Sequence, residues 1–114
     1  MKIAKSSDVL KSPVETEGAK DVAIRWLISK EDGAENFAMR MFEVQPGGHT
    51  PLHTHPQEHE VFVLEGQGTF VYERKEHPFK SEFVIFVPGN KEHQFKNTGD
   101  GLLRMLCIIP LRVE

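Results

Sequence analysis

The sequence predicts an all-β domain, either a sandwich or a barrel, and three observations support that class. Short segments with an apolar or alternating pattern recur at about the 8–12-residue spacing that is typical of such folds. Turn-forming residues separate them, as in the Pro-Gly-Gly run at 46–48 and the Asn-Thr-Gly-Asp-Gly run at 97–101. No stretch after Lys20 has a convincing helical period. With 114 residues, the chain is long enough for one domain with a real core and too short for two comfortable ones.

The individual strands follow from local patterns. Residues 22–28 place Val22, Ile24 and Trp26 on one face of an extended segment, which indicates a strand. Residues 61–64 are apolar on both faces, as expected of a strand that is covered on both sides. The remaining strands are expected at 37–44 (ended by the turn at 46–48), 69–72, 83–87, 93–95 and 102–109, with turns at 32–33, 66–68 and 88–90 and a polar turn at 73–77.

The sequence does not assign one secondary structure to the N-terminal segment, residues 1–20. Within it, residues 6–18 fit either a short helix or an edge strand, and the segment either packs on the barrel or is swapped between barrels. Residues 21–114 then form the barrel domain. No linker, low-complexity tract or internal repeat divides the chain.

Composition excludes several functional classes. A net charge of -3, a pI near 6.1 and the lack of a basic stripe argue against nucleic acid as a partner. No run approaches the roughly 20 apolar residues that span a bilayer, so no membrane partner is expected. The N-terminus lacks the apolar region of a signal peptide. A single cysteine, Cys107, excludes an internal disulfide and suits a reducing compartment, so we expect a cytoplasmic protein.

Histidines are crowded in one short stretch. Three of the six fall within residues 53–59, and His93 follows downstream. Neighbouring imidazoles resist protonation and rarely pack as core, so a bound metal ion is the simplest reason for the cluster. Solvated histidines in a polar surface loop are the alternative. His49 and His77 lack such company, and we expect them not to be ligands.

The spacing of these histidines is compatible with one ion. His53 and His55 share a face of an extended segment and can converge on an ion at about 2.0–2.2 Å each. His59 would lie about 13 Å further along a straight strand, so the chain must turn between them, and Pro56 is placed for that turn. His93 has to come from another strand. The site can therefore form only when the fold closes.

Two motifs make the chain similar to the cupin superfamily. The first cupin motif runs glycine, paired histidines, a glutamate in most members, then glycine, and it is matched here by Gly47, His53, His55, His59 and Gly66. The second runs proline, glycine, histidine, asparagine, and it is matched by Pro88, Asn90, His93 and Asn97. Asn90 replaces a glycine, but Asn tolerates a positive φ and should preserve the turn. The resemblance implies a single-domain, cupin-type jelly-roll β-barrel, in agreement with the all-β class.

The resemblance also implies a four-histidine metal site made by His53, His55, His59 and His93. His59 stands where most cupins have a glutamate ligand, and Glu60, one step along the strand, should point to the opposite face. Four neutral imidazoles would leave the full charge on a divalent ion and two open positions on a six-coordinate one. Similarity to small four-histidine cupins makes manganese the first choice of ion, while imidazole ligands also suit Fe, Co, Ni, Cu and Zn.

Strand parity selects residues that could line a cavity around the ion. Phe95 lies on the ligand face of its strand, Met105 and Cys107 share a face of the last strand, and Arg40 could hold an anionic substrate. The alternatives are ordinary core packing for the first three and an exposed or paired arginine. Glu58 or a bound water is the candidate acid or base.

These features favour a metal-dependent enzyme acting on a small molecule, and an oxygenase or related oxidoreductase is the first expectation. A non-catalytic, metal-dependent binding or sensor module is the main alternative, and a sugar isomerase or epimerase is another, because fold does not fix function. Apolar strands such as residues 61–64 offer more apolar surface than one small barrel should hide. We therefore expect a homodimer.

Overall fold

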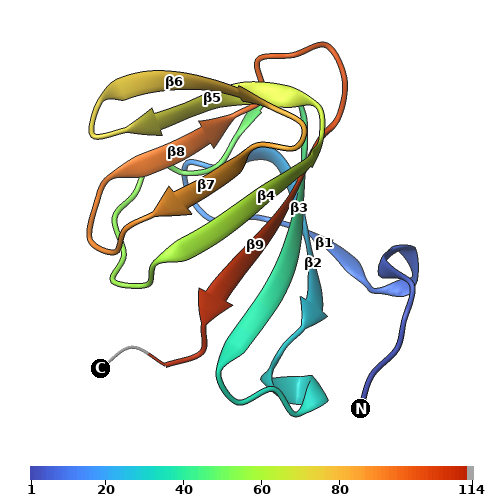
Figure 1. The fold of residues 1–114 in the computed structure, drawn as a ribbon. Coiled ribbons are helices and arrows are strands. Elements are labelled where there is room, and N and C mark those ends of the chain that lie inside the picture. The colour runs from blue at the N-terminus through green and yellow to red at the C-terminus, as the bar shows by residue number, and fades with distance from the viewer. Residues whose placement is uncertain (113–114) are drawn as a thin grey trace.

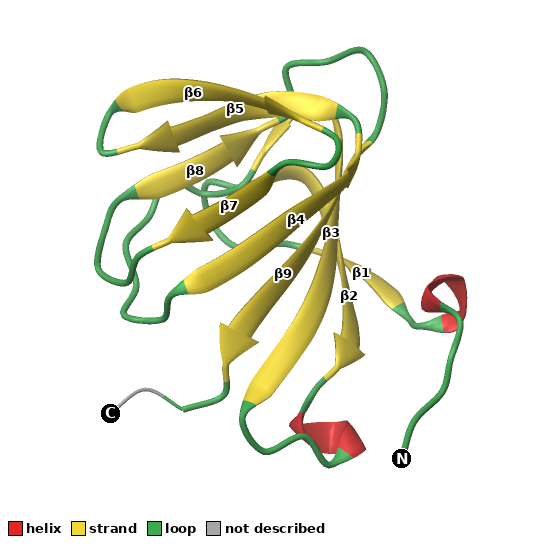
Figure 2. Ribbon diagram, viewed as in Figure 1, coloured by secondary structure: helices red, strands yellow, loops and turns green. Residues whose placement is uncertain are grey.

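The all-β class is confirmed by the structure, a computed structural model that describes residues 1–112. Within these residues nine strands form one strongly curled sheet (Figures 1 and 2). The strands are β1 (Lys11–Pro13), β2 (Lys20–Ile28), β3 (Phe37–His49), β4 (His59–Glu65), β5 (Gln67–Tyr72), β6 (Lys75–Lys80), β7 (Val84–Val87), β8 (His93–Lys96) and β9 (Leu103–Pro110). Two short 3₁₀ helices accompany them, η1 (Ser6–Asp8) and η2 (Lys30–Asp32). No helix in the described part of the chain is long and apolar enough to cross a membrane.

Strand β3 is the centre of the sheet. The strand order is β6-β5-β8-β3-β9-β4-β7, with β2 also paired to β3 and β1 paired to β2. All of these pairs are antiparallel. Because β3 pairs with β2, β8 and β9, it connects the two parts of the curled sheet.

Strand β3 continues through residues 46–48, so the expectation that this Pro-Gly-Gly segment ends it is wrong. Gly47 has a φ of +82°, which glycine adopts without a steric penalty. A Cβ at Gly48 would lie 2.6 Å from the backbone oxygen of Lys20, so only glycine fits there without a shift. The two glycines bend β3 instead of ending it. Before the bend β3 pairs with β9, and after it His49 pairs with β8.

The segment 73–77 is mostly strand, which corrects the expected polar turn. The turn itself is tight, with Glu73 and Arg74 at positive φ values of 47° and 69°. Strand β6 begins directly afterwards and forms a hairpin with β5. Because β6 ends the strand order, Pro78 can lie within it despite lacking an N–H group.

The N-terminal segment contains both structures that the sequence left open, since η1 is followed by the short strand β1. The guanidinium of Arg25 holds it in place by donating to the backbone oxygen of Val9 at 2.6 Å and to the Glu43 carboxylate at 3.0 Å. In this chain the segment therefore packs on β2. The proposed domain division at residues 20 and 21 stays a prediction, and residues 113–114 lie outside the described residues.

The concave face of the sheet carries the core. Alternation along each strand turns apolar side chains inward, and the most deeply buried ones, at 0–1% exposure, come from β3, β4, β7 and β9. The core cluster consists of Val22, Val44, Val61, Val63, Phe70, Phe79, Val87, Phe95, Leu103, Met105 and Cys107.

Asn97 is a buried polar residue that fixes the connection after β8. Its side-chain amide donates to the backbone oxygens of Val44 at 2.8 Å and Gly101 at 2.9 Å. Its side-chain oxygen accepts a hydrogen bond from the backbone of Gly99 at 3.0 Å. One side chain thus joins β3 to the turn between β8 and β9, and all of its hydrogen-bonding groups are used.

We predict that Asn97→Ala lowers the free energy of unfolding by about 2–4 kcal/mol, because it leaves buried backbone groups without partners. Urea denaturation followed by circular dichroism measures the change. Asp100→Ala, an exposed position in the same turn, is the matched control and should change stability by less than about 0.5 kcal/mol. Equal stabilities of the two variants would contradict the role given to Asn97.

Candidate metal centre

A loop, residues 50–58, joins β3 to β4 and carries two of the histidines. Its first residue is tied to β8, because the Thr50 hydroxyl accepts a hydrogen bond from the backbone of Phe95 at 2.9 Å. His53 and His93 exchange two backbone hydrogen bonds, of 3.2 Å and 3.0 Å. The pairing fixes the loop against β8 and places the two imidazoles side by side.

The second half of the loop bends back toward the barrel. The chain turns at Pro56 and Gln57, as the spacing of the histidines requires. The backbone of Asn90 donates to the oxygen of His55 at 2.7 Å, which ties this bend to the turn before β8. Asn90 has a φ of +64°, in agreement with the expectation that it preserves a turn where cupins have glycine.

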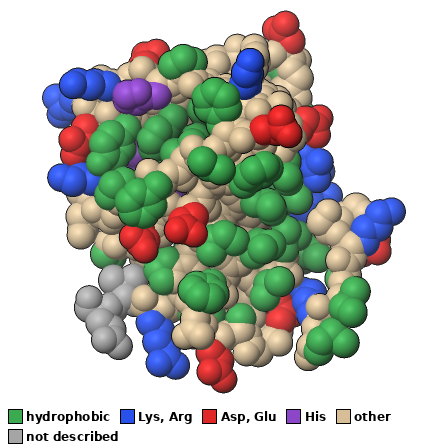
Figure 3. Space-filling view, in the orientation of Figure 1, with side chains coloured by type: hydrophobic (Ala, Val, Ile, Leu, Met, Phe, Trp, Pro, Cys, Tyr) green, Lys and Arg blue, Asp and Glu red, His purple; other side chains and the backbone are tan. Residues whose placement is uncertain are grey.

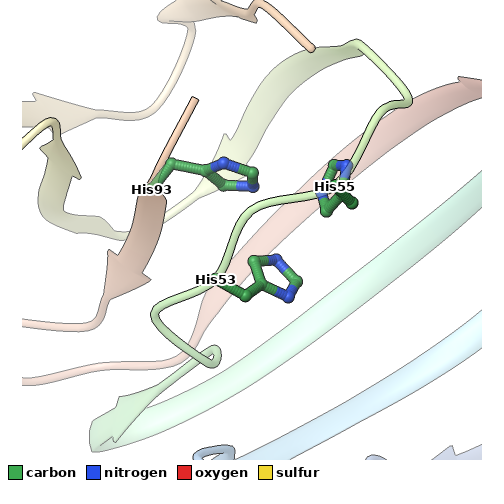
Figure 4. Close-up of side chains that lie close together, drawn as sticks. All are labelled: His53, His55 and His93. Carbon is green, nitrogen blue, oxygen red and sulfur yellow. The ribbon is translucent and has the colours of Figure 1, made fainter. Parts of the chain in front are cut away.

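Three imidazoles converge in this region. The potential ligand atoms of His53, His55 and His93 all lie within 4.8 Å of one another. Figure 4 shows the three rings facing a common space, two from the loop and one from β8. Their ring centroids are 4.8–4.9 Å apart. A single ion could therefore be bound by all three side chains after small rotations.

His59, at the start of β4, lies beside this group. Its ring is stacked on that of His55 with centroids 4.4 Å apart, and it lies 5.7 Å from the ring of His93. Its role as a fourth ligand stays a prediction. Among the described residues, His49 and His77 do not belong to the group, and Glu58 is exposed at the end of the loop.

Burial lowers the pKa of three of these imidazoles, those of His53, His55 and His59, and so favours their neutral form. His53 has an exposed edge, yet burial, with the neighbouring His93 and His55 as smaller causes, lowers its pKa to about 4. Burial and then the charge of Arg40 lower the pKa of His59 to about 3. Burial is also the main cause that lowers the pKa of His55. Neutral imidazoles present free lone pairs, which is the form that binds a metal ion.

Hydrogen bonding within the group also fits a metal ion. Nδ1 of His93 lies 2.8 Å from the backbone oxygen of Lys91 and donates its proton there, which leaves Nε2 as the nitrogen that could face an ion. Both ring nitrogens of His55 are buried without a hydrogen-bond partner. Because buried polar atoms rarely lack partners and a neutral imidazole offers one lone pair, an ion at this position would satisfy one of the two nitrogens.

A cavity of about 370 Å³ lies inside the curled sheet, next to the histidine cluster. His53, His59 and His93 lie in its wall, and most of the remaining wall is apolar. The volume falls within the range of about 300–1,000 Å³ that is typical of small-molecule sites. The cavity is lined by Pro13, Val14, Glu15, Thr16, Val22, Ile24, Trp26, Arg40, Phe42, Thr50, Pro51, His53, His59, Val61, His93, Phe95, Met105 and Cys107.

All four side chains selected by strand parity lie in this wall, namely Arg40, Phe95, Met105 and Cys107. Glu58 does not line the cavity. Sequence reasoning missed the contribution of β2, although the alternation that predicted this strand also places Ile24 and Trp26 on one face. It also missed residues 13–16, at the end of β1 and just after it, for which no periodic signal exists.

The fold and the site together define a class: a small antiparallel β-barrel with an internal cavity and a histidine cluster able to hold a divalent metal ion. The profile of the cupin domain matches residues 40–109, and the chain belongs to the cupin family. The fold is accordingly a cupin jelly-roll barrel, as the motifs implied.

Known proteins of several functions resemble the chain. The structure of the polyketide cyclase RemF from Streptomyces resistomycificus superposes with a TM-score of 0.92 at 35% identity, covering 98% of this chain and 80% of that one. The oxalate-binding protein of Thermotoga maritima is 34% identical over 98 residues, which are 82% of this chain and 79% of the relative. The 1-methylthio-D-xylulose 5-phosphate methylsulfurylase of Rhodospirillum rubrum is 35% identical over 71 residues, which are 62% of this chain and 46% of that enzyme. The chain thus matches less than half of the methylsulfurylase.

We predict that the purified protein binds roughly one divalent transition-metal ion per chain. His53→Ala and His93→Ala should each weaken metal binding by more than about 100-fold, which exceeds the loss typical of residues that only support a ligand. Metal content by mass spectrometry and calorimetric titration with Mn²⁺ and Zn²⁺ measure this. The His59→Ala variant distinguishes two kinds of site. In a four-histidine site it should lose a similar amount of metal affinity, and in a three-histidine site it should keep its affinity.

His77→Ala is the matched control, since His77 is exposed on β6, and it should bind as the wild type does. Circular dichroism verifies that each variant is folded. Unchanged metal binding by a folded His53→Ala/His93→Ala protein would rule out this site.

Proposed function

We propose that the protein is a metal-dependent enzyme acting on a small molecule, with a divalent ion, manganese as first choice, held by His53, His55, His59 and His93. The observation that carries the proposal is the convergence of His53, His55 and His93, two of which lie in the wall of a mostly apolar cavity, while the ring nitrogens of the third, His55, are buried without a partner. When bound, the ion would act as a Lewis acid toward a substrate oxygen. The chain's own residues would bind and orient the substrate and exclude water from it.

Redox-neutral chemistry on a carbonyl compound is the first candidate reaction. It is supported by the likeness to a polyketide cyclase over 98% of this chain. The cavity suits such a substrate, because Trp26, Phe42 and Phe95 offer aromatic faces and the histidines lie at the same wall. Because neutral histidines would leave the full positive charge on a bound divalent ion, that ion would stabilise negative charge developing on a substrate oxygen.

The oxygenase activity expected from the sequence stays a second candidate. It rests on the open coordination positions that a four-histidine site would leave on the ion. The two candidates differ in one requirement, because an oxygenase consumes dioxygen and a cyclase or enolisation catalyst does not.

A non-catalytic binding role is a further alternative, supported by the likeness to an oxalate-binding protein over 82% of this chain. A binding protein would retain the ion and the cavity but leave its ligand unchanged. The same assay can therefore distinguish all three.

We predict that the metal-loaded protein accelerates exchange of the C2 protons of ethyl acetoacetate with D₂O at least about 100-fold over the metal-free protein, the range of acid-base catalysis. Proton NMR measures the exchange, with and without dioxygen, and an oxygen electrode measures uptake. Exchange that is independent of dioxygen supports redox-neutral carbonyl chemistry.

The His77→Ala variant should catalyse this exchange at the wild-type rate, and the His53→Ala variant only at the rate of the metal-free protein. Oxygen uptake in proportion to substrate loss would favour the oxygenase. Binding of the ester with neither exchange nor uptake would favour the binding role.

We also propose a homodimer that covers the outer face of β4, β7 and β9. Phe62, Val84 and Phe86 are exposed there, Val84 by 76% and Phe86 by 58%. Leu106 and Ile108 adjoin them on β9. Figure 3 shows hydrophobic side chains gathered on this face. Contiguous apolar surface of this kind is typical of an interface and rare on a monomer.

The double variant Val84→Glu/Phe86→Glu is predicted to convert the dimer to a monomer, because charges on both copies would face each other across the interface. Light scattering after size exclusion measures the mass against the 13.0 kDa of one chain. Leu10→Glu, at an exposed apolar position on the N-terminal segment, is the control and should stay dimeric. A wild-type protein of single-chain mass would end the dimer proposal.

The cytoplasm remains the proposed compartment. Cys107 is buried and unpaired, which suits a reducing environment.

A further inference from the structure

Besides Glu15, Arg40 is the charged residue of a cavity wall that is otherwise mostly apolar. It lies on β3, with Trp26 of β2 and Cys107 of β9 as its neighbours across the two strand pairs. The guanidinium carbon lies 5.6 Å from the ring centre of Trp26 and 4.9 Å from that of Phe42. Two aromatic faces thus hold the guanidinium in place at the cavity wall.

The charge of Arg40 has no anionic partner in the described part of the chain. Its Nε is buried without a hydrogen-bond partner. Its Nη2 lies 3.0 Å from the sulfur of Cys107. Burial raises the pKa of that thiol despite the nearby charge, so Cys107 stays neutral and does not compensate Arg40.

Two arginines on the neighbouring strands form ion pairs with glutamates. Arg25 on β2 lies 3.0 Å from the Glu43 carboxylate, and Arg104 on β9 lies 3.4 Å from the Glu65 carboxylate. Both point away from the cavity, as alternation along the strands requires. The arginine that faces the cavity is thus the one whose guanidinium is left for a ligand.

We propose that Arg40 binds a carboxylate group of the substrate, so that the enzyme takes a small organic acid whose carboxylate lies on Arg40 and whose reacting oxygen lies at the histidines. This inference rests on the proposed function and names its substrate class. A guanidinium is a planar donor that matches a carboxylate with two parallel hydrogen bonds. A phosphate ester, with more charge, would need donors beyond the single guanidinium that the cavity wall provides.

The test compares levulinate, a keto acid, with its neutral methyl ester. Trp26 is the single tryptophan of the chain and lies beside Arg40, so its fluorescence reports occupancy, and calorimetry gives the affinity. Metal-loaded wild type should bind levulinate at least about 10-fold more tightly than the ester. Arg40→Met should weaken levulinate binding by about 10- to 100-fold and leave ester binding unchanged. Arg40→Lys should retain part of the preference, because it keeps the charge and loses the two-bond geometry.

Arg104→Met, on the outer face, is the matched control and should bind levulinate as the wild type does. Thermal unfolding separates binding from packing, because removal of an unpaired, partly buried charge should leave the melting temperature unchanged or raise it. A clear fall in melting temperature together with equal losses for acid and ester would overturn the proposal in favour of a packing role. Full levulinate binding by Arg40→Met would overturn it as well, whatever the exchange assay shows.

Two further arms separate this inference from the proposed function. If the chain holds no metal but the metal-free protein still prefers levulinate in an Arg40-dependent way, the carboxylate site stands and the metal-dependent function fails. If inorganic phosphate displaces levulinate at equal concentration, Arg40 recognises charge alone and the assignment to a carboxylate is overturned.

Discussion

The two backbone hydrogen bonds between His53 and His93 are the contact on which the site depends. They close a loop between β3 and β4 against β8, 40 residues further along the chain. Without this bridge, the imidazoles of the loop and of β8 would have no fixed relation. Thr50, bonded to Phe95, and Asn97, bonded to Val44, repeat the connection further along the same strands. The histidine cluster is therefore a product of tertiary pairing.

The bend in β3 makes that pairing possible. A straight strand could not follow β9 over its first half and reach β8 with its last residue. Gly47 at positive φ and Gly48 against the backbone of β2 allow the change of direction. The sequence predicted that these two glycines end the strand. They bend it instead, and the bend brings the histidine loop to the cavity.

The sequence was sufficient for the fold class and for the side-chain parity of the long strands. Period-two patterns placed Arg40, Phe95, Met105 and Cys107 on faces that do line one cavity. It was insufficient where a local signal has two meanings. A Pro-Gly-Gly run can end a strand or bend it, and a charged segment such as 73–77 can be a turn or an exposed edge strand. Which meaning holds depends on neighbours that are distant in sequence. For the same reason the sequence could not predict that residues 13–16 line the cavity, because their position follows from the pairing of β1 with β2.

The electrostatics of the cavity favour an anion. Arg40 and the histidines lie in one apolar wall, and the charge of Arg40 is the second cause, after burial, that lowers the pKa of His59. A cationic imidazole would add a second positive charge near Arg40, and this repulsion adds to burial in lowering the pKa of His53 and His59. A divalent ion would add still more positive charge to the same wall. Such an arrangement is costly as long as the positive charges lack an anionic partner. An anionic substrate would supply a counter-charge to the arginine and to the ion together, so the proposal makes Arg40 unpaired in the resting protein and paired in the complex.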